Sequence, residues 1–111
     1  MLKDRGFTEG DWRLFRNKLP EWQEAYMDGL NREYIQLLSD SRAPSENFWE
    51  LERRIREDKH RAGVCLEMRR SVMLDNIIRL LREGVITVED INDFSDELKD
   101  AVRFVSGNAD I

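Results

Sequence analysis

The sequence contains little of the material from which strands, membrane spans and disulfides are built. Among its 111 residues there are one cysteine, two prolines and six glycines, and β-branched residues are sparse outside residues 64–91. A single cysteine cannot form an internal disulfide, which is typical of a reducing compartment. No apolar run approaches the roughly 20 residues that cross a bilayer, and the first residues lack the apolar segment of a signal peptide. We therefore expect an all-α protein that resides in the cytoplasm and has no membrane partner.

The residue groupings that carry catalysis or hold a metal are also missing. His60 is the single histidine and lies in a polar run. Cys65 stands between Val64 and Leu66 without a base nearby, which favours a small buried hydrophobic residue over a nucleophile. No cysteine and histidine spacing fits zinc, no glycine-rich loop resembles a phosphate-binding turn, and residues 90–96 lack the glycine and final glutamate of a calcium loop. We expect no cofactor, no metal and no enzymatic activity.

The most strongly patterned stretch is residues 68–91, which predicts a core helix, a turn and the start of another helix. Gly84 follows the apolar run where a left-handed C-cap residue is expected, so the helix should end there. Seven apolar residues recur before it at helical spacing and cover a wide arc of the helix surface: Val72, Met73, Leu74, Ile77, Ile78, Leu80 and Leu81.

Residues 88–105 are predicted to form the last helix. Thr87 and Asp90 have the spacing of a capping box at its start, and Ser95 offers a second cap midway. Because the turn before it is only about three residues long, this helix and the preceding one should form an antiparallel or steeply crossed hairpin. Residues 106–111 lack periodicity and are predicted to be a frayed tail.

Residues 81–91, LREGVITVEDI, resemble the short C-terminal helical hairpin module known as SHOCT. The pattern of that module runs leucine, glycine, isoleucine, threonine, an acidic pair and an aromatic residue. Here Ile91 stands in place of the aromatic residue, and no lysine-rich run follows. The resemblance implies an oligomerisation or tethering role without catalysis.

The first part of the chain predicts two helices separated at Pro20. Thr8 and Asp11 have the spacing of a capping box for the first helix. Proline removes an amide donor, so we expect a break, with Pro20 at the first position of a second helix that ends near residue 39. Aromatic residues at helical spacing are interpreted as core: Trp12, Phe15, Trp22, Tyr26 and Tyr34.

A third helix is predicted to follow the loop at residues 39–45, which is rich in turn-forming residues. Ser45 is placed to cap this helix. Gly63 favours a break before the core helix, with one continuous helix over residues 45–83 as the alternative. The positions predicted to be buried recur at helical spacing: Phe48, Leu51 and Ile55.

Charge is distributed unevenly along the chain, although the net charge is only −5. Residues 53–82 contain nine Lys or Arg against four Asp or Glu, whereas residues 1–52 contain seven against eleven and residues 83–111 two against eight. A basic middle between acidic ends can be screened by those ends, or it can meet a second copy of the chain through complementary patches. The overall acidity disfavours nonspecific binding of nucleic acid.

The basic run of residues 52–61 and the arginines that follow it are the one candidate surface for phosphate or nucleic acid. Three pairs of acid and base four residues apart are expected to form surface ion pairs on a helix: Glu50 with Arg54, Glu52 with Arg56, and Glu57 with Arg61. The remaining basic residues are predicted to be unpaired and are the candidate anion-binding residues: Arg53, Lys59, His60, Arg69 and Arg70. A solvated helix face is the alternative interpretation.

These observations predict a single-domain helical bundle of four to six helices over residues 1–111, with the C-terminal hairpin at its centre. The wide apolar arc of residues 72–81 in so short a chain is expected to leave surface unburied. The predicted function is therefore a protein-protein interaction module that forms a homo-oligomer. One alternative is a regulator that contacts nucleic acid or phosphate through the basic residues 53–70. Another is a small-molecule sensor or enzyme that uses the aromatic residues as a pocket.

Overall fold

Four α-helices make up most of the chain in the computed structural model, which describes residues 8–106. They are α1 (Glu9–Leu38), α2 (Pro44–Asp58), α3 (Met73–Arg82) and α4 (Asp96–Ser106), with two short 3-10 helices, η2 (Arg70–Val72) and η3 (Val88–Ile91). Residues 8–106 contain no strand, so the predicted all-α class is confirmed. None of these helices is long and apolar enough to cross a membrane. Apart from Ser106, which ends α4, the predicted frayed tail lies outside the described residues.

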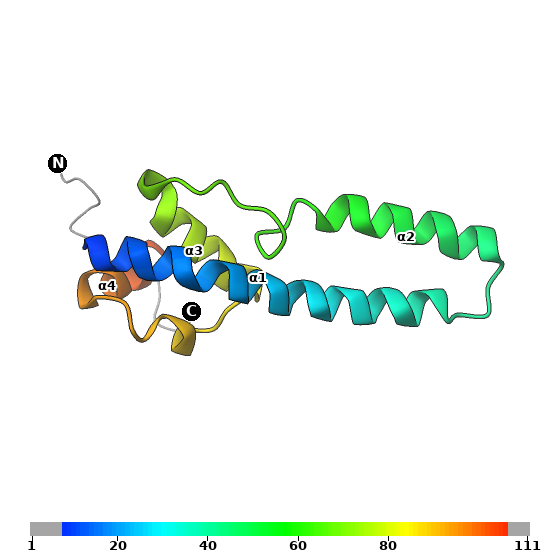
Figure 1. Cartoon of the computed structure of the whole chain (residues 1–111), viewed down its shortest axis with the longest axis horizontal. Coiled ribbons are helices and arrows are strands. Elements are labelled where there is room, and N and C mark those ends of the chain that lie inside the picture. Colours follow the sequence, from blue (N-terminus) through cyan, green and yellow to red (C-terminus); the bar gives the residue numbers. More distant parts are fainter. Residues whose placement is uncertain (1–7, 107–111) are drawn as a thin grey trace.

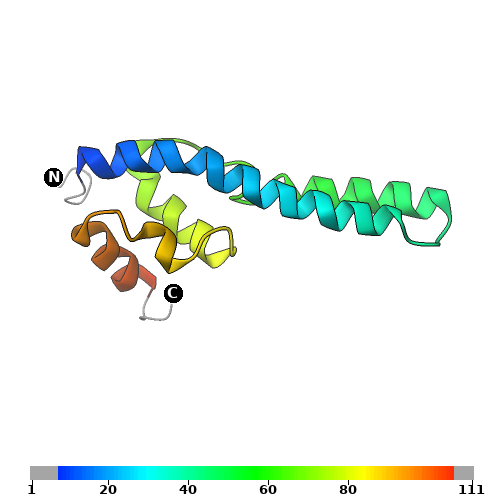
Figure 2. The ribbon, with the colours of Figure 1, turned by 60° about the horizontal axis from the view of Figure 1, so that its bottom comes forward.

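The molecule is elongated because α1 carries two separate packing units along its length (Figure 1). Its extents are 56 × 26 × 19 Å and its radius of gyration is 17.0 Å, against about 13 Å for a compact domain of 100 residues. Figure 2 shows α3, η3 and α4 gathered beside the first half of α1, while α2 runs back along the second half. We call the first unit the head (residues 8–22 and 62–106) and the second the arm (residues 27–58).

α1 runs without a break through Pro20, so the predicted division into two helices is wrong. Proline leaves the carbonyl of Arg16 without its helical donor and costs about 3 kcal/mol inside a helix. Both Pro20 and Arg16 are exposed, so water can satisfy that carbonyl. On the buried side of the same turns, Phe15 and Leu19 pack in the head at 0% and 4% exposure, and this packing offsets the cost.

The core lies in the head and is built on α3. The apolar arc predicted for residues 72–81 is almost fully covered there, since Met73, Ile77 and Leu80 are each at most 1% exposed. The chain therefore covers with its own helices the surface that was expected to remain open. The other buried members of this core come from α3 itself, from α1, from the connector and from the C-terminal part of the chain: Leu74, Ile78, Phe15, Leu19, Ala62, Ile86, Ile91, Phe94, Leu98 and Val102.

Gly84 ends α3 in the left-handed conformation that the sequence predicts, with φ of 75°. The N–H of Val85 donates to the carbonyl of Leu80 at 2.9 Å, and the N–H of Gly84 donates to the carbonyl of Leu81 at 3.2 Å. These two bonds form a Schellman motif, which satisfies the last carbonyls of α3 and reverses the chain.

The single last helix predicted over residues 88–105 is divided into η3 and α4. Thr87 starts η3, and its N–H donates to the carboxylate of Asp90 at 2.8 Å. The chain then turns, and Ser95 caps α4 by accepting the N–H of Leu98 on its Oγ at 3.1 Å. The midway cap offered by Ser95 is thus the one that starts the longer helix.

Asp11 explains this division, because it holds the start of α4 against the start of α1. Its side chain is 3% exposed, and its carboxylate accepts both the N–H of Ser95 at 2.8 Å and the hydroxyl of Ser95 at 2.6 Å. With its N–H bound to α1, Ser95 cannot continue a helix from η3. Asp11 also bonds Thr8 in both directions, at 2.9 and 3.3 Å, which confirms the predicted capping box of α1.

α2 begins two residues earlier than the predicted cap allows. Ala43 is the N-cap residue and Pro44 the first helical residue, so the prediction of Ser45 as the cap is wrong. The N–H of Ala43 donates instead to the carboxylate of Glu46 at 3.1 Å. Proline suits this position because its missing N–H needs no partner in the first helical turn.

A connector of residues 59–69 links the arm to the head, so the predicted break near Gly63 is confirmed. Residues 65–69 of the connector have no regular secondary structure, and burial alternates between consecutive residues from Val64 to Glu67. Val64 and Leu66 are half-buried, whereas Cys65 between them is exposed. The prediction of Cys65 as a buried residue is wrong because it assumed that its apolar neighbours shared its side of the chain.

Candidate interaction surface on the arm

The arm has no apolar core of its own on the α2 side. The buried residues of α2 are two polar ones, Asn47 and Asp58. Of the three positions predicted to be buried, Phe48 is 60% exposed and Ile55 40% exposed, and only Leu51 is half-buried. The prediction is therefore wrong for Phe48 and Ile55, although it identified the apolar stripe correctly.

These apolar side chains share one side of the arm. Two depressions line that side, one near the head between Met27, Tyr34 and Ile55 and one near the tip between Leu38, Phe48 and Leu51. Tyr34 and Leu38 on α1, and Ile55 and Leu51 on α2, are each about one helical turn apart, so the two depressions are neighbours along the arm. We call this surface, together with the adjoining Ile35, the apolar face, and its members are Met27, Tyr34, Ile35, Leu38, Phe48, Leu51 and Ile55.

Several members of the apolar face are exposed to a degree that is unusual for large side chains. Ile35 is 64% exposed and Leu38 50% exposed on α1. On α2 the ring of Phe48 packs edge-on against the ring of Trp49, with centroids 4.9 Å apart and an interplanar angle of 89°. Trp49 is itself 63% exposed, so two aromatic rings stand together at the edge of the apolar face near the tip.

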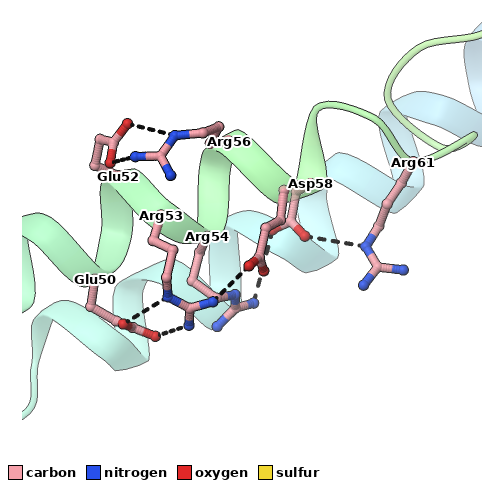
Figure 3. A network of polar contacts seen from close by, with 8 residues as sticks. Glu50, Glu52, Arg53, Arg54, Arg56, Asp58 and Arg61 are labelled. Carbon is pink, nitrogen blue, oxygen red and sulfur yellow. Dashed lines mark hydrogen bonds and ion pairs between the residues drawn. The ribbon is translucent and has the colours of Figure 1, made fainter.

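The opposite side of the arm is ionic (Figure 3). Arg53 binds Glu57 at 2.8 Å and also binds Glu50, while Arg54 reaches across to Glu33 of α1 at 2.7 Å. The hydrogen bond from Arg53 holds the pKa of the Glu50 carboxyl below its usual range. The arm therefore has one side on which charges neutralise one another and one side on which apolar carbon faces solvent.

The ion pairs differ from those that sequence spacing predicts. The pair of Glu52 with Arg56 is confirmed. The other two are wrong, because Glu50 and Glu57 both bind Arg53, and Arg61 binds Asp58 at 3.2 Å. The observed partners also lie three or four residues apart, so spacing alone allowed several pairings. A carboxylate of α1 draws Arg54 away from Glu50.

The five candidate anion-binding residues do not form one patch. Arg53 lies on the arm, whereas Arg70 binds Glu9 at the far end of the head and Arg69 binds Glu67 at 2.7 Å. Glu9, the partner of Arg70, and Glu33, the partner of Arg54 on the arm, are about 36 Å apart along α1, at 1.5 Å per residue. Lys59 and His60, near the base of the arm, have no ion pair in the part of the chain that the structure describes. Anion or nucleic-acid contact by these residues stays a prediction.

The aromatic residues are divided between the head and the arm. Phe15 is fully buried, and its ring lies 6.2 Å from that of Trp12 and 6.3 Å from that of Trp22, between centroids. Trp12 and Trp22 are half-buried against the same core, which agrees with the interpretation of these rings as core. Tyr34 belongs instead to the arm, where it binds Asp58.

A buried acidic residue fixes the base of the arm. Asp58 is 5% exposed and lies at the C-terminal end of α2, where the helix dipole disfavours a carboxylate. Its two oxygens accept the hydroxyl of Tyr34 at 2.5 Å and the Nε–H of Arg61 at 3.2 Å, and Arg54 lies 4.0 Å away. The two arginines compensate the buried negative charge, and Tyr34 ties the end of α2 to α1. Sequence patterns gave no sign of this contact, because Asp58 stands in a run of charged residues.

Tyr34 should make the stability of the protein fall at alkaline pH. Its burial, followed by the hydrogen bond to Asp58, raises its pKa from 10.0 to about 12. Because the folded state holds the proton more tightly than the unfolded state, this stabilisation is complete below pH 10 and is lost as the pH rises towards 12. Titration of phenolate absorbance should give a step near pH 12, and Y34F should remove it. A wild-type titration without a step near pH 12 that Y34F removes would contradict the expectation.

Comparisons of the chain with protein-family models, with curated proteins and with solved structures found no match. Within residues 8–106, no three or more His, Cys, Asp or Glu side chains are grouped so that they could hold a metal ion. The surface of the arm is therefore the main basis for a functional proposal.

Proposed function

We propose that this protein is a protein-interaction module that self-associates through the apolar face of the arm. The observation that carries the proposal is the exposure of Leu38 and Phe48, at 50% and 60%, on segments of α1 and α2 that pack mainly against each other. Two helices alone cannot cover their own apolar stripes, and a third or fourth helix is the usual cover in a bundle. A second copy of the arm supplies both missing helices.

The size of the apolar face supports this function. The exposed side chains of Ile35, Leu38, Phe48 and Ile55, together with Trp49 at the edge of the face, present roughly several hundred Å², which is as large as the largest apolar patches on monomeric proteins. Stable interfaces bury roughly 800 Å² per partner, and the half-buried members of the face add to the total. Covering one large apolar side chain contributes about 1.5–3 kcal/mol.

The proposed contact lies on the arm, whereas the sequence suggested a contact through the apolar arc of residues 72–81. The apolar arc of α3, which suggested self-association, is buried in the head. The SHOCT-like segment, residues 81–91, implies oligomerisation, but Ile86 and Ile91 are 3% and 2% exposed within the same core. On the arm, by contrast, five large hydrophobic side chains are exposed, and the rings of Phe48 and Trp49 are in contact.

Replacing Phe48 with glutamate tests the proposal. We expect the wild-type protein to be a dimer or larger assembly by light scattering after size exclusion, and F48E to be monomeric at the same concentration. The reason is that a charge on the apolar face would be desolvated on association, which costs several kcal/mol. Phe104 on α4 is 85% exposed and provides a control, since F104E changes an even more exposed aromatic residue in the head.

The control separates loss of the interface from general solubility. F104E should keep the mass of the wild-type assembly, and circular dichroism should show the same helical content in all three proteins. A wild-type protein that remains monomeric over a wide concentration series would disprove self-association. Equal loss of assembly in F104E would show that the contact does not lie on the arm.

A further inference from the structure

An ion pair lies at the edge of the apolar face, where a partner that covers the face would meet it. Glu52 and Arg56 lie one turn apart on α2 and bind each other. Figure 3 shows them on a different side of the helix from the network of Arg53, Arg54 and Asp58. Helical spacing puts Glu52 one turn from Phe48 and close to Ile55, so the pair borders the apolar face. The side chains of Glu52 and Arg56 are 44% and 60% exposed, which leaves both available to a partner.

We infer that two arms pack antiparallel, with one apolar face against the other, so that Glu52 of each copy lies opposite Arg56 of the other copy. This inference rests on the proposed function. In a contact with two-fold symmetry, residue i of one copy meets residue j of the other and j meets i. A two-fold axis that passes level with Arg54, midway between residues 52 and 56, therefore gives two ion pairs, each between Glu52 of one copy and Arg56 of the other.

The same axis gives a partner to a second side chain. Residues 49 and 59 are equally far from position 54, so Lys59 of one α2 faces Trp49 of the other. Lys59 has no ion pair within the described chain, and Trp49 is 63% exposed. An ammonium group near an indole ring is an attractive contact. Two independent pairs of side chains thus match at one register.

The shape of the molecule also favours the antiparallel arrangement. The head is wider than the arm (Figure 2), and antiparallel arms place the two heads at opposite ends of a four-helix bundle. Parallel arms would bring the heads together and would set α2 against α1 of the other copy. In that arrangement Glu52 and Arg56 do not meet their counterparts.

Two single-charge reversals, studied separately and mixed, test the inference. E52R carries two positive side chains along the edge and R56E carries two negative ones, so each variant alone repels its own copy. We expect each variant alone to self-associate at least tenfold more weakly than the wild-type protein. An equimolar mixture should restore association, because the two positive side chains of E52R then face the two negative side chains of R56E. The double variant E52R/R56E should associate as the wild-type protein does.

The measurement is sedimentation velocity of the mixture, with one variant labelled at Cys65, which is exposed and lies in the connector. Circular dichroism checks that both single variants keep their helical content after losing the internal pair. A mixture that stays as monomeric as its components, while the wild-type protein dimerises and F48E does not, would overturn the antiparallel register and leave the proposed function standing. A wild-type protein without self-association would overturn both.

Discussion

Replacing Gly63 with alanine should destabilise the protein by about 3 kcal/mol, at the upper end of the usual cost of overpacking. Gly63 is buried in the connector directly beneath the ring of Tyr26. A methyl group added to Gly63 would lie 2.2 Å from Cδ2 and 2.4 Å from Cγ of that ring. Rotation of the ring about the Cβ–Cγ bond does not relieve the contact, because Cγ lies on that axis. The Tyr26 side chain, the connector or α1 must therefore shift, which loosens the packing of the connector against α1.

Urea unfolding followed by circular dichroism measures this effect, and a second glycine supplies the control. Gly29 lies on the exposed surface of α1 with nothing within 4 Å of an added methyl group. G29A should therefore stabilise the protein by about 0.5–1 kcal/mol, because alanine is the better helix former. In a double variant, Y26A should reduce the cost of G63A, since the removed ring leaves room. Equal and small effects of G63A and G29A would disprove the close approach of Gly63 to Tyr26.

Local signals in the sequence predict much of the fold. The caps at Thr8 and Gly84 and the break near Gly63 each depend on a few neighbouring residues, and the structure confirms all three. The class of the protein follows from the same signals, because helices with defined ends and no strand material leave few alternatives. These features required no knowledge of which helix packs against which.

The errors at Phe48, Ile55 and Pro20 share one physical cause, which is that a periodic pattern identifies an apolar stripe without showing what covers it. Phe48 and Ile55 lie on such a stripe, as do the residues of α3, but only α3 lies in the head core. Pro20 is tolerated for the same kind of reason, since distant parts of the head hold α1 on either side of it. The candidate interaction surface could not be predicted because it consists of the stripe that the fold leaves uncovered.

The wrong predictions for the partners of Arg54 and Arg61 have a related physical cause. Spacing within α2 suggested partners for Arg54 and Arg61, but Glu33 lies on α1 and Asp58 is held by Tyr34. A carboxylate on another helix competes on equal terms with one four residues away, and the sequence does not show which helices are neighbours. The candidate anion-binding residues are dispersed for the same reason, because the connector carries Arg69 and Arg70 to the far end of the head.

Replacing Asp11 with alanine should destabilise the protein by about 3 kcal/mol, which is comparable to the effect at Gly63. The carboxylate of Asp11 accepts three hydrogen bonds, two from Ser95 and one from Thr8. Hydrogen bonds to a charged group contribute about 1.5–3 kcal/mol each, and a buried donor left without a partner costs a further 1–3 kcal/mol, to order of magnitude. The total cost is smaller than the sum of these contributions, because Thr8 is exposed and water can replace the bond that it donates.

Asp90 is the matched control for Asp11, because it performs the same capping role without the long-range contact. It accepts the N–H of Thr87 at 2.8 Å at the start of η3 and is exposed, so D90A should cost about 1 kcal/mol or less. The difference between the two variants measures the bond of Asp11 to Ser95, which joins residues 84 positions apart. S95A should remove part of the same energy and add little in the double variant with D11A. Fully additive effects of D11A and S95A would show that the two residues act separately, as a helix cap on α1 and a helix cap on α4.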